Sequence, residues 1–266
     1  MASTKEIQNR IKSIKDTMKI TNAMYMISSS KLKKAKKDLE NTEPYFYTLQ
    51  VSLARLLRHL PDMDHLYFEN EDDEKKENPK RGYIVVTADK GMAGAYNHNI
   101  IKIAEEELAN HPDSELYVVG QVGRHYFARK NVPVDIHFQY TAQNPSLHRA
   151  RVIADKMLEN YESGKIDEVY IIYTKMINSV TAEPEMIQLL PFRKIDFKIS
   201  QADVYHEEII IEPSPRAVMD RIVPNYITGF IYGALVESFC SEQNSRMMAM
   251  DSATRSAKDM LADLSI

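Results

Sequence analysis

The chain has 266 residues, of which 44% are hydrophobic and 27% charged, a balance typical of a soluble folded protein. A single cysteine, Cys240, excludes an internal disulfide and fits a reducing compartment. No apolar run approaches the length of a membrane span. The N-terminal segment lacks the apolar core of a signal peptide, and Glu6 argues against a transit peptide. We therefore expect a cytoplasmic protein, or one that reaches the cytoplasmic face of a membrane through its partners.

The net charge of −4 is distributed unevenly along the chain. Residues 1–59 contain 12 Lys or Arg against 5 Asp or Glu, whereas residues 207–266 contain 5 basic and 9 acidic residues. Opposite charges on the two terminal segments favour their pairing, although salt weakens the effect.

Residues 1–60 are predicted to form one long helix, capped by Ser3 or Thr4 and kinked at Pro44. Apolar or small residues recur at alternating steps of four and three, the spacing of a coiled-coil seam. The ten seam positions are Ile7, Ile11, Ile14, Met18, Thr21, Tyr25, Ser28, Leu32, Ala35 and Leu39. Such a narrow stripe must face another helix.

Residues 61–80 are predicted to be an acidic loop that links the helix to the next domain. The stretch is rich in Asp and Glu and ends at a proline, Pro79. A solvated surface loop explains this composition.

Residues 81–208 are predicted to form a Rossmann-like α/β domain, because strand-like and helix-like segments alternate. Strands are expected at 82–87, 116–120, 132–138, 168–174 and around 186–190, and helices at 95–110, 124–130 and 146–161. Ser146 is a plausible start for the last of these helices.

Residues 209–266 are predicted to form a second long helix, with Ser214 as its cap, Pro215 in its first turn and a bend at Pro224. Its seam positions are Val236, Cys240, Gln243, Met247, Met250, Thr254, Ala257, Leu261 and Leu264. The predicted fold class is α/β, with a long antiparallel, left-handed coiled coil of the terminal helices and an inserted Rossmann-like domain. The seven-residue repeat is the reason to expect left-handed supercoiling.

The loop 87–94 follows a strand and opens a helix, which is where a dinucleotide loop would lie. It lacks the glycine spacing of a nucleotide fingerprint, and Asp89 would repel a phosphate. We interpret it as a strand–helix turn in which Gly94 is needed because the turn tolerates little bulk. No spacing of histidines or cysteines indicates a metal site, and no carboxylates pair in apolar surroundings. The sequence therefore offers no catalytic, cofactor or metal site.

Two segments of the terminal helices, 23–30 and 246–254, are small or methionine-rich around much of their circumference. A helix that is weakly polar all round is usually enclosed by protein, so a partner should surround them. A basic cluster follows the first segment and comprises Lys31, Lys33, Lys34, Lys36 and Lys37. A solvated helix face, a nucleic-acid site and a contact with an acidic partner all remain open for this cluster.

Three segments together closely resemble the gamma subunit of F-type ATP synthases of the bacterial type. Residues 10–35 (RIKSIKDTMKITNAMYMISSSKLKKA) resemble its N-terminal helix, residues 88–97 (ADKGMAGAYN) its loop after the first strand, and residues 241–254 (SEQNSRMMAMDSAT) its C-terminal helix. The order and spacing of these segments cover nearly the whole chain. The C-terminal helix of the family continues for several turns beyond the position of Ile266.

The resemblance implies a non-catalytic rotor stalk that transmits torque between an ion-driven membrane ring of c subunits and a catalytic head. It implies alpha, beta and epsilon subunits and the c-ring as partners, contact with the membrane only through the c-ring, no nucleic acid and no bound cofactor. The expected location is the cytoplasmic face of the bacterial cell membrane. Positions expected to contact the alpha/beta head are Met24, Lys31, Lys33, Lys34, Arg246 and Met247.

Two other functions remain open on the residues alone. One is a coiled-coil tether with a regulatory, ligand-binding α/β domain, which predicts nucleotide binding by the isolated chain. The other is a basic helical clamp for nucleic acid, which predicts salt-sensitive DNA binding.

Overall fold

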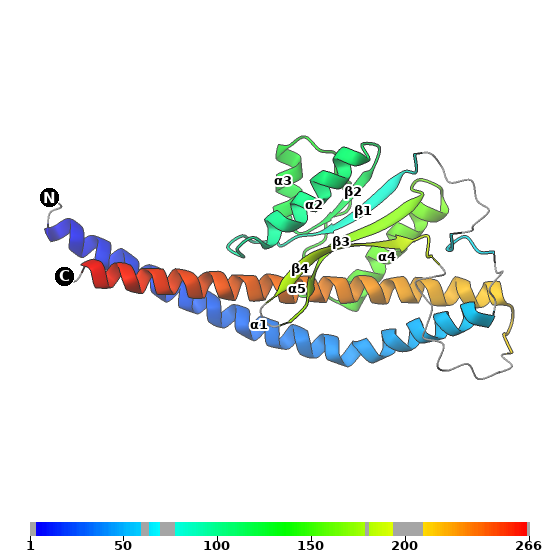
Figure 1. The fold of residues 1–266 in the computed structure, drawn as a ribbon, viewed down its shortest axis with the longest axis horizontal. Helices are drawn as coiled ribbons and strands as arrows, with labels where there is room; N and C mark the ends of the chain where they lie inside the picture. The colour runs from blue at the N-terminus through cyan, green and yellow to red at the C-terminus, as the bar shows by residue number, and fades with distance from the viewer. Residues whose placement is uncertain (1–3, 60–63, 70–77, 179–180, 194–209, 265–266) are drawn as a thin grey trace.

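A computed structural model describes residues 4–59, 64–69, 78–178, 181–193 and 210–264 (Figure 1). Two long helices run side by side, and an α/β domain lies against part of their length. In chain order the elements are α1 (Thr4–His59), β1 (Arg81–Val86), α2 (Tyr96–Asn110), β2 (Glu115–Val119), α3 (Gln121–Arg129), α4 (Leu147–Glu162), β3 (Glu168–Met176), β4 (Ala182–Leu190) and α5 (Pro215–Leu264).

Helices α1 and α5 form an antiparallel pair, which we call the shaft. Thr21 contacts Thr254 through their hydroxyls at 2.7 Å, and at the other end the rings of Phe46 and Tyr232 lie 6.2 Å apart. At 1.5 Å per residue, the 56 residues of α1 span about 84 Å. The start of α1 and the end of α5 lie at the same tip of the shaft, beyond the α/β domain (Figure 1).

The heptad stripes predicted from the sequence face one another in the shaft. Thr21, Ser28 and Ala35 are buried at seven-residue intervals, and so are Met250 and Ala257 on α5. The stripe is wrong at one position, because Tyr25 is 39% exposed and Met24 is the better covered of the two.

Both helices continue through their internal prolines. Pro44 lacks the amide that would bond to the carbonyl of Glu40, and α1 curves without breaking (Figure 1). The predicted start of the C-terminal helix at residue 209 lies outside the described residues, and α5 begins at Pro215. Its cap is the predicted one, since Ser214 accepts a hydrogen bond from the amide of Ala217 at 3.2 Å.

The four strands form one sheet in the order β2-β1-β3-β4. Strands β2, β1 and β3 are parallel, and β4 is an antiparallel edge strand. Pro184 is tolerated within β4 because an edge strand has one side that needs no partner. The sheet is therefore mixed, although most of it has the parallel order expected of a Rossmann-like domain.

The strand predicted at 132–138 is wrong. Pro133 has no amide to donate, and Asp135 closes a turn by accepting from the amides of His137 (2.8 Å) and Phe138 (3.1 Å). The segment instead runs irregularly beside β2, and the amide of Asp135 donates to the carbonyl of Leu116 at 3.1 Å.

The predicted acidic loop is only partly described, because residues 61–63 and 70–77 lie outside the described residues. Residues 64–69 are not a solvated loop: Tyr67 and Phe68 are buried, and Phe68 pairs with Phe192 in an isolated bridge. The aromatic side chains within this short stretch explain the difference, because they lose more by exposure than the neighbouring charges gain.

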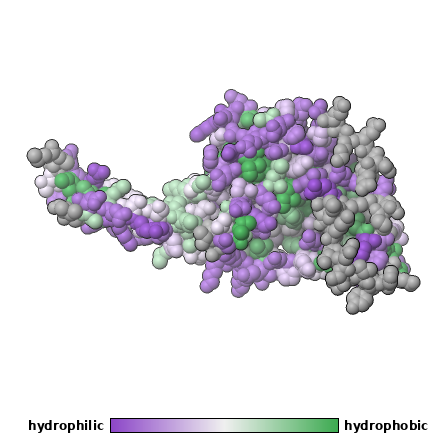
Figure 2. Space-filling model, viewed as in Figure 1, coloured by the Kyte–Doolittle hydropathy of each residue, from purple (hydrophilic) through white to green (hydrophobic). Residues whose placement is uncertain are grey.

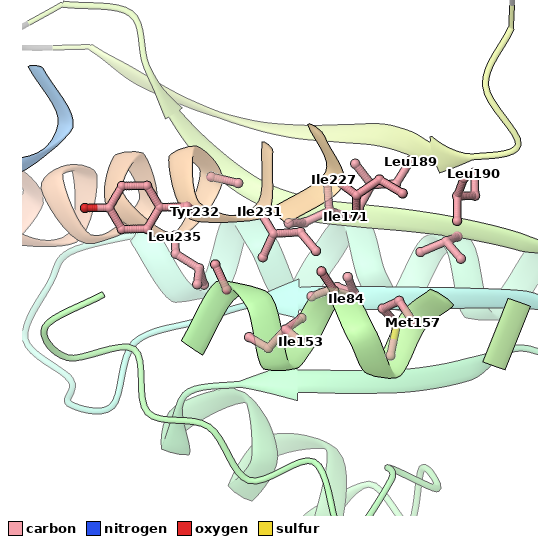
Figure 3. Close-up of a cluster of buried hydrophobic side chains, with 14 of the residues drawn as sticks. Ile84, Ile153, Met157, Ile171, Leu189, Leu190, Ile227, Ile231, Tyr232 and Leu235 are labelled. Atoms are coloured by element: carbon pink, nitrogen blue, oxygen red, sulfur yellow. The ribbon is translucent and has the colours of Figure 1, made fainter. Parts of the chain in front are cut away.

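Alternate residues of each central strand point to opposite faces of the sheet, and both faces are covered. On one face Tyr83, Val85 and Val118 pack against α2 and α3. On the other, α4 and α5 cover the sheet: in Figure 3, Ile84 lies between Ile153 of α4 and Ile231 of α5, and Ile171 lies beside Ile227 of α5. Helix α5 therefore belongs to two structures at once, the core of the α/β domain and the shaft.

Candidate functional site: the shaft and its joint with the domain

The carboxyl ends of parallel strands are where α/β proteins usually bind ligands. Here Asp89, directly after β1, occupies that edge. Its carboxylate accepts hydrogen bonds from the amides of Gln121 (3.0 Å), Ala142 (2.9 Å) and Gln143 (3.1 Å), and from the hydroxyl of Thr141. Because Gln121 is the first residue of α3, the carboxylate sits where a phosphate would lie at a helix N-terminus.

The following amides of α3 are also used within the chain. The amide of Val122 donates to the carbonyl of Ala88 at 3.0 Å, and that of Gly123 donates to the hydroxyl of Thr87 at 3.0 Å. Gly120 approaches so closely that a Cβ there would lie 2.3 Å from the carbonyl oxygen of Thr87. The edge is therefore filled by the loop itself, which disfavours a nucleotide site.

Gly94 is required for a different reason from the one expected. No heavy atom lies within 4 Å of the position that its Cβ would occupy, so bulk is tolerated there. Its φ of 56°, however, lies in the left-handed region that favours glycine.

The same edge of the sheet is bonded to α5. Ser238 accepts from the amide of Thr174 at 3.0 Å, and Ser241 donates to the carbonyl of Thr174 at 3.3 Å. Glu237 accepts from the amide of Met176 at 3.4 Å. These bonds attach the end of β3 to the shaft.

Arg246 attaches the loop after β1 to the shaft. Its Nη1 forms an ion pair with Oε1 of Glu242 at 2.7 Å, and its Nη2 donates to the carbonyls of Lys90 (3.1 Å) and Gly91 (3.2 Å). The residue is only 7% exposed. Arg246 was expected to face the head of an ATP synthase, but its guanidinium is directed into its own chain.

Burial dominates the electrostatics of this joint. It raises the pKa of Glu242, and the positive charge of Arg246 opposes the rise. The pKa of Tyr96, which packs with Ala88 and Ala93 of the loop, is raised by burial and by the charge of Glu242. The phenol therefore stays neutral.

The other residues expected to contact the head differ in how far they are exposed. Lys33 and Lys34 are exposed, whereas Lys31 is half-buried and donates to Oε1 of Gln143 at 2.9 Å. Met24 and Met247 are half-buried within the shaft. The structure thus brings Lys31 and Arg246 to the loops of the α/β domain, and leaves Lys33 and Lys34 on the surface.

Apolar side chains point outward from the shaft close to these lysines. Ile20 is 61% exposed and Met26 73%, and Ile27 and Met248 are also exposed. On the face shown in Figure 2, a pale and green band lies on the shaft where it leaves the α/β domain. This arrangement suits a shaft that another protein encloses.

Sequence reasoning missed one exposed residue of the joint. Met92 is 65% exposed and has a φ of 60°, in the loop that Arg246 holds. A methionine between Gly91 and Gly94 could have indicated an exposed apolar residue in a turn. The sequence does not show that Arg246 bonds to the preceding carbonyls of Lys90 and Gly91.

Within the described ranges, no group of three or more His, Cys, Asp or Glu side chains is placed to hold a metal ion. Among the helices that the structure describes, none has the length and apolar character needed to cross a bilayer.

Comparison with known proteins gives a consistent result. The family model described as ATP synthase matches residues 3–266. The ATP synthase gamma chain of Ruminiclostridium cellulolyticum is 43% identical over 98% of this chain and 90% of its own length, and that of Acetivibrio thermocellus is 44% identical over 100% and 92%. The sodium ion specific gamma chain of Acetobacterium woodii is 30% identical over 99% and 91%.

Solved structures share the fold. A chain from the central stalk and c-ring of the Tetrahymena thermophila mitochondrial ATP synthase superposes with a TM-score of 0.66 at 23% identity. The match covers 88% of this chain and 99% of that one.

Proposed function

The chain belongs to the ATP synthase gamma chain family, and on this premise we propose that it is the central rotor stalk of an F-type ATP synthase. The subunit is non-catalytic. It transmits torque between an ion-driven c-ring in the membrane and a head of alternating alpha and beta subunits, and so couples ion flow to ATP synthesis or hydrolysis.

One observation supports this function most strongly: the shaft extends beyond the α/β domain and exposes apolar side chains there. A shaft that only tethered two domains would gain nothing from exposed Ile20, Met26 and Ile27. A left-handed coiled coil, enclosed by the alpha/beta head, explains them, because the head would cover this apolar surface.

The α/β domain would form the foot of the rotor and contact the epsilon subunit and the c-ring. It would lie at the cytoplasmic face of the bacterial membrane, which the subunit reaches only through the c-ring. The domain's role as a scaffold is supported by Asp89, which already occupies the edge where a ligand would bind.

The two alternative functions have less support. A ligand-binding tether needs an open crevice at the carboxyl edge of the sheet, and the loop after β1 fills that edge. A nucleic-acid clamp needs a basic surface, but the chain carries a net charge of −4 and the lysine cluster is not interleaved with aromatic residues.

The test uses Lys33→Glu with Lys34→Glu, because these two lysines are exposed. Exposed ion pairs contribute at most about 1 kcal/mol each, so the variant should fold and assemble. It should nevertheless lower the ratio of ion-driven ATP synthesis to ATP hydrolysis in reconstituted vesicles, because repulsion replaces attraction to an acidic partner at some rotor angles.

The matched control is Lys102→Glu with Arg129→Glu, which makes the same change of charge on the outer helices α2 and α3. This control should leave the ratio unchanged. If the double variant of the shaft assembles and keeps the ratio of the unmodified enzyme, the two lysines are solvated surface and do not contact the head.

A further inference from the structure

We propose that Arg246 is a positioning residue that fixes residues 90–94 of the loop after β1 against the turn of α5 that carries it. The inference rests on the proposed function only for its second readout, the coupling of the assembled enzyme. The structural readout needs the isolated chain alone.

The guanidinium of Arg246 connects three groups that nothing else joins in the described part of the chain. One nitrogen pairs with Glu242 on the same helix, and the other donates to two successive carbonyls, those of Lys90 and Gly91. A planar fork can serve both sides at once, whereas the single ammonium of a lysine cannot. The side chain therefore acts as a cross-link between α5 and the loop.

The loop depends on such a cross-link because its own conformation is unfavourable. Met92 and Gly94 both have positive φ values, of 60° and 56°. Such a value is uncommon for a residue other than glycine, and the side chain of Met92 is exposed, so packing does not fix it. The first part of the loop is held independently, because Asp89 accepts from the amides of Gln121 and Ala142. Ala93 and Tyr96 are buried with Ala88, and Arg246 holds the carbonyls of Lys90 and Gly91 between them.

The buried ion pair is better explained by orientation than by stability. Glu242 is fully buried, and removing a carboxylate and a guanidinium from water offsets much of their attraction. The two directional bonds to the loop, however, can form only when one particular turn of α5 faces the loop. The pair therefore selects the angular register of the joint.

A second attachment lies about two turns away along α5. Ser238 and Ser241 hold the end of β3, and eight residues, or about 12 Å, separate Ser238 from Arg246. Two attachments at different levels resist rotation of the domain about the shaft better than one. Loss of Arg246 would leave the β3 attachment and the bonds of Asp89, and would free residues 90–94 from α5.

The first experiment is hydrogen exchange on the isolated full chain. Arg246→Met keeps an unbranched apolar side chain and removes the donors. We expect amide exchange in residues 90–96, where the amide of Tyr96 donates to the carbonyl of Ala93 at 3.2 Å, to rise about tenfold or more, because backbone groups with few contacts open readily. Arg246→Lys should give partial protection. Arg255→Met is the control, since Arg255 forms the same i, i+4 pair with Asp251 at 2.6 Å but is exposed.

Amide exchange in β2 and β3 distinguishes global unfolding from local release of the loop. If Arg246→Met raises exchange throughout these strands, Arg246→Lys becomes the deciding variant, because it keeps the charge beside Glu242. Unchanged exchange of residues 90–96 in both Arg246→Lys and Arg246→Met would overturn the positioning role. Glu242→Gln gives a further check, because the bonds to the carbonyls remain and the loop should stay protected.

The second readout is the ratio of ATP synthesis to hydrolysis in the assembled enzyme. A released loop with a lowered ratio supports the inference. A released loop with an unchanged ratio, in an assembly where the Lys33 and Lys34 variant does lower it, shows that the loop's position does not affect coupling. If neither variant alters the ratio, neither the two lysines nor the position of the loop affects coupling, and the exchange result alone decides the positioning role. The proposed function fails if an enzyme assembled with the unmodified chain carries out no ion-driven ATP synthesis.

Discussion

Gly229 and Gly233 lie four residues apart on α5, and their surroundings predict opposite effects of the same substitution to alanine. A Cβ at Gly229 would lie 1.9 Å from Cδ1 and 2.4 Å from Cε1 of Phe46, whereas no atom lies within 4 Å of a Cβ at Gly233. Both glycines are inside a helix, so replacement by alanine removes the same conformational cost, about 0.5–1 kcal/mol.

Gly233→Ala should therefore increase the free energy of unfolding by about 0.5–1 kcal/mol. In Gly229→Ala the same gain is offset by overpacking, which typically costs about 1–3 kcal/mol, because the ring of Phe46 must move. That movement also disturbs its contacts with Tyr45 and Tyr232, whose ring centroids lie 5.2 and 6.2 Å away. The two variants should differ by about 1–3 kcal/mol, which is the steric cost alone.

Urea unfolding followed by far-ultraviolet circular dichroism measures this difference as a shift in midpoint. Repeating Gly229→Ala in a Phe46→Ala background should convert the loss into a gain, because the obstructing ring is absent. If Gly229→Ala is as stable as Gly233→Ala with Phe46 present, α1 and α5 do not cross in the way that the structure shows.

Two further predictions concern buried groups of the shaft. Thr21→Val should lower the free energy of unfolding by about 1–2 kcal/mol, because the hydroxyl of Thr254 loses its partner in the seam. The double change Thr21→Val with Thr254→Val should cost less than the sum of the two single changes. Additive losses in thermal unfolding would contradict the shared bond. Burial raises the pKa of Cys240 from 9.0 to about 11. Between these pH values the unfolded chain releases a proton that the folded chain keeps. The free energy of unfolding should therefore fall by up to about 1.4 kcal/mol for each pH unit of increase because of this cysteine. Cys240→Val should remove that part of the slope, and equal slopes for the two proteins in unfolding series from pH 8 to about 11 would refute the assignment.

Local sequence determined the helices and their contact faces. A stripe at alternating steps of four and three predicts which side of a helix is covered whatever lies opposite, and Thr21, Ser28, Met250 and Ala257 are buried as expected. Helix caps are equally local, because the hydroxyls of Ser146 and Ser214 bond to amides three residues further on.

Only the tertiary structure decided what these elements contact. The β-like composition of 132–138 could not reveal that Asp135 would close a turn there. The resemblance implied that Arg246 contacts the alpha/beta head, and this stays a prediction. The sequence could not show that its guanidinium also donates to the carbonyls of Lys90 and Gly91, more than 150 residues away in the chain. Spacing along a helix determines a direction around its axis, whereas the partner in that direction depends on how distant segments pack.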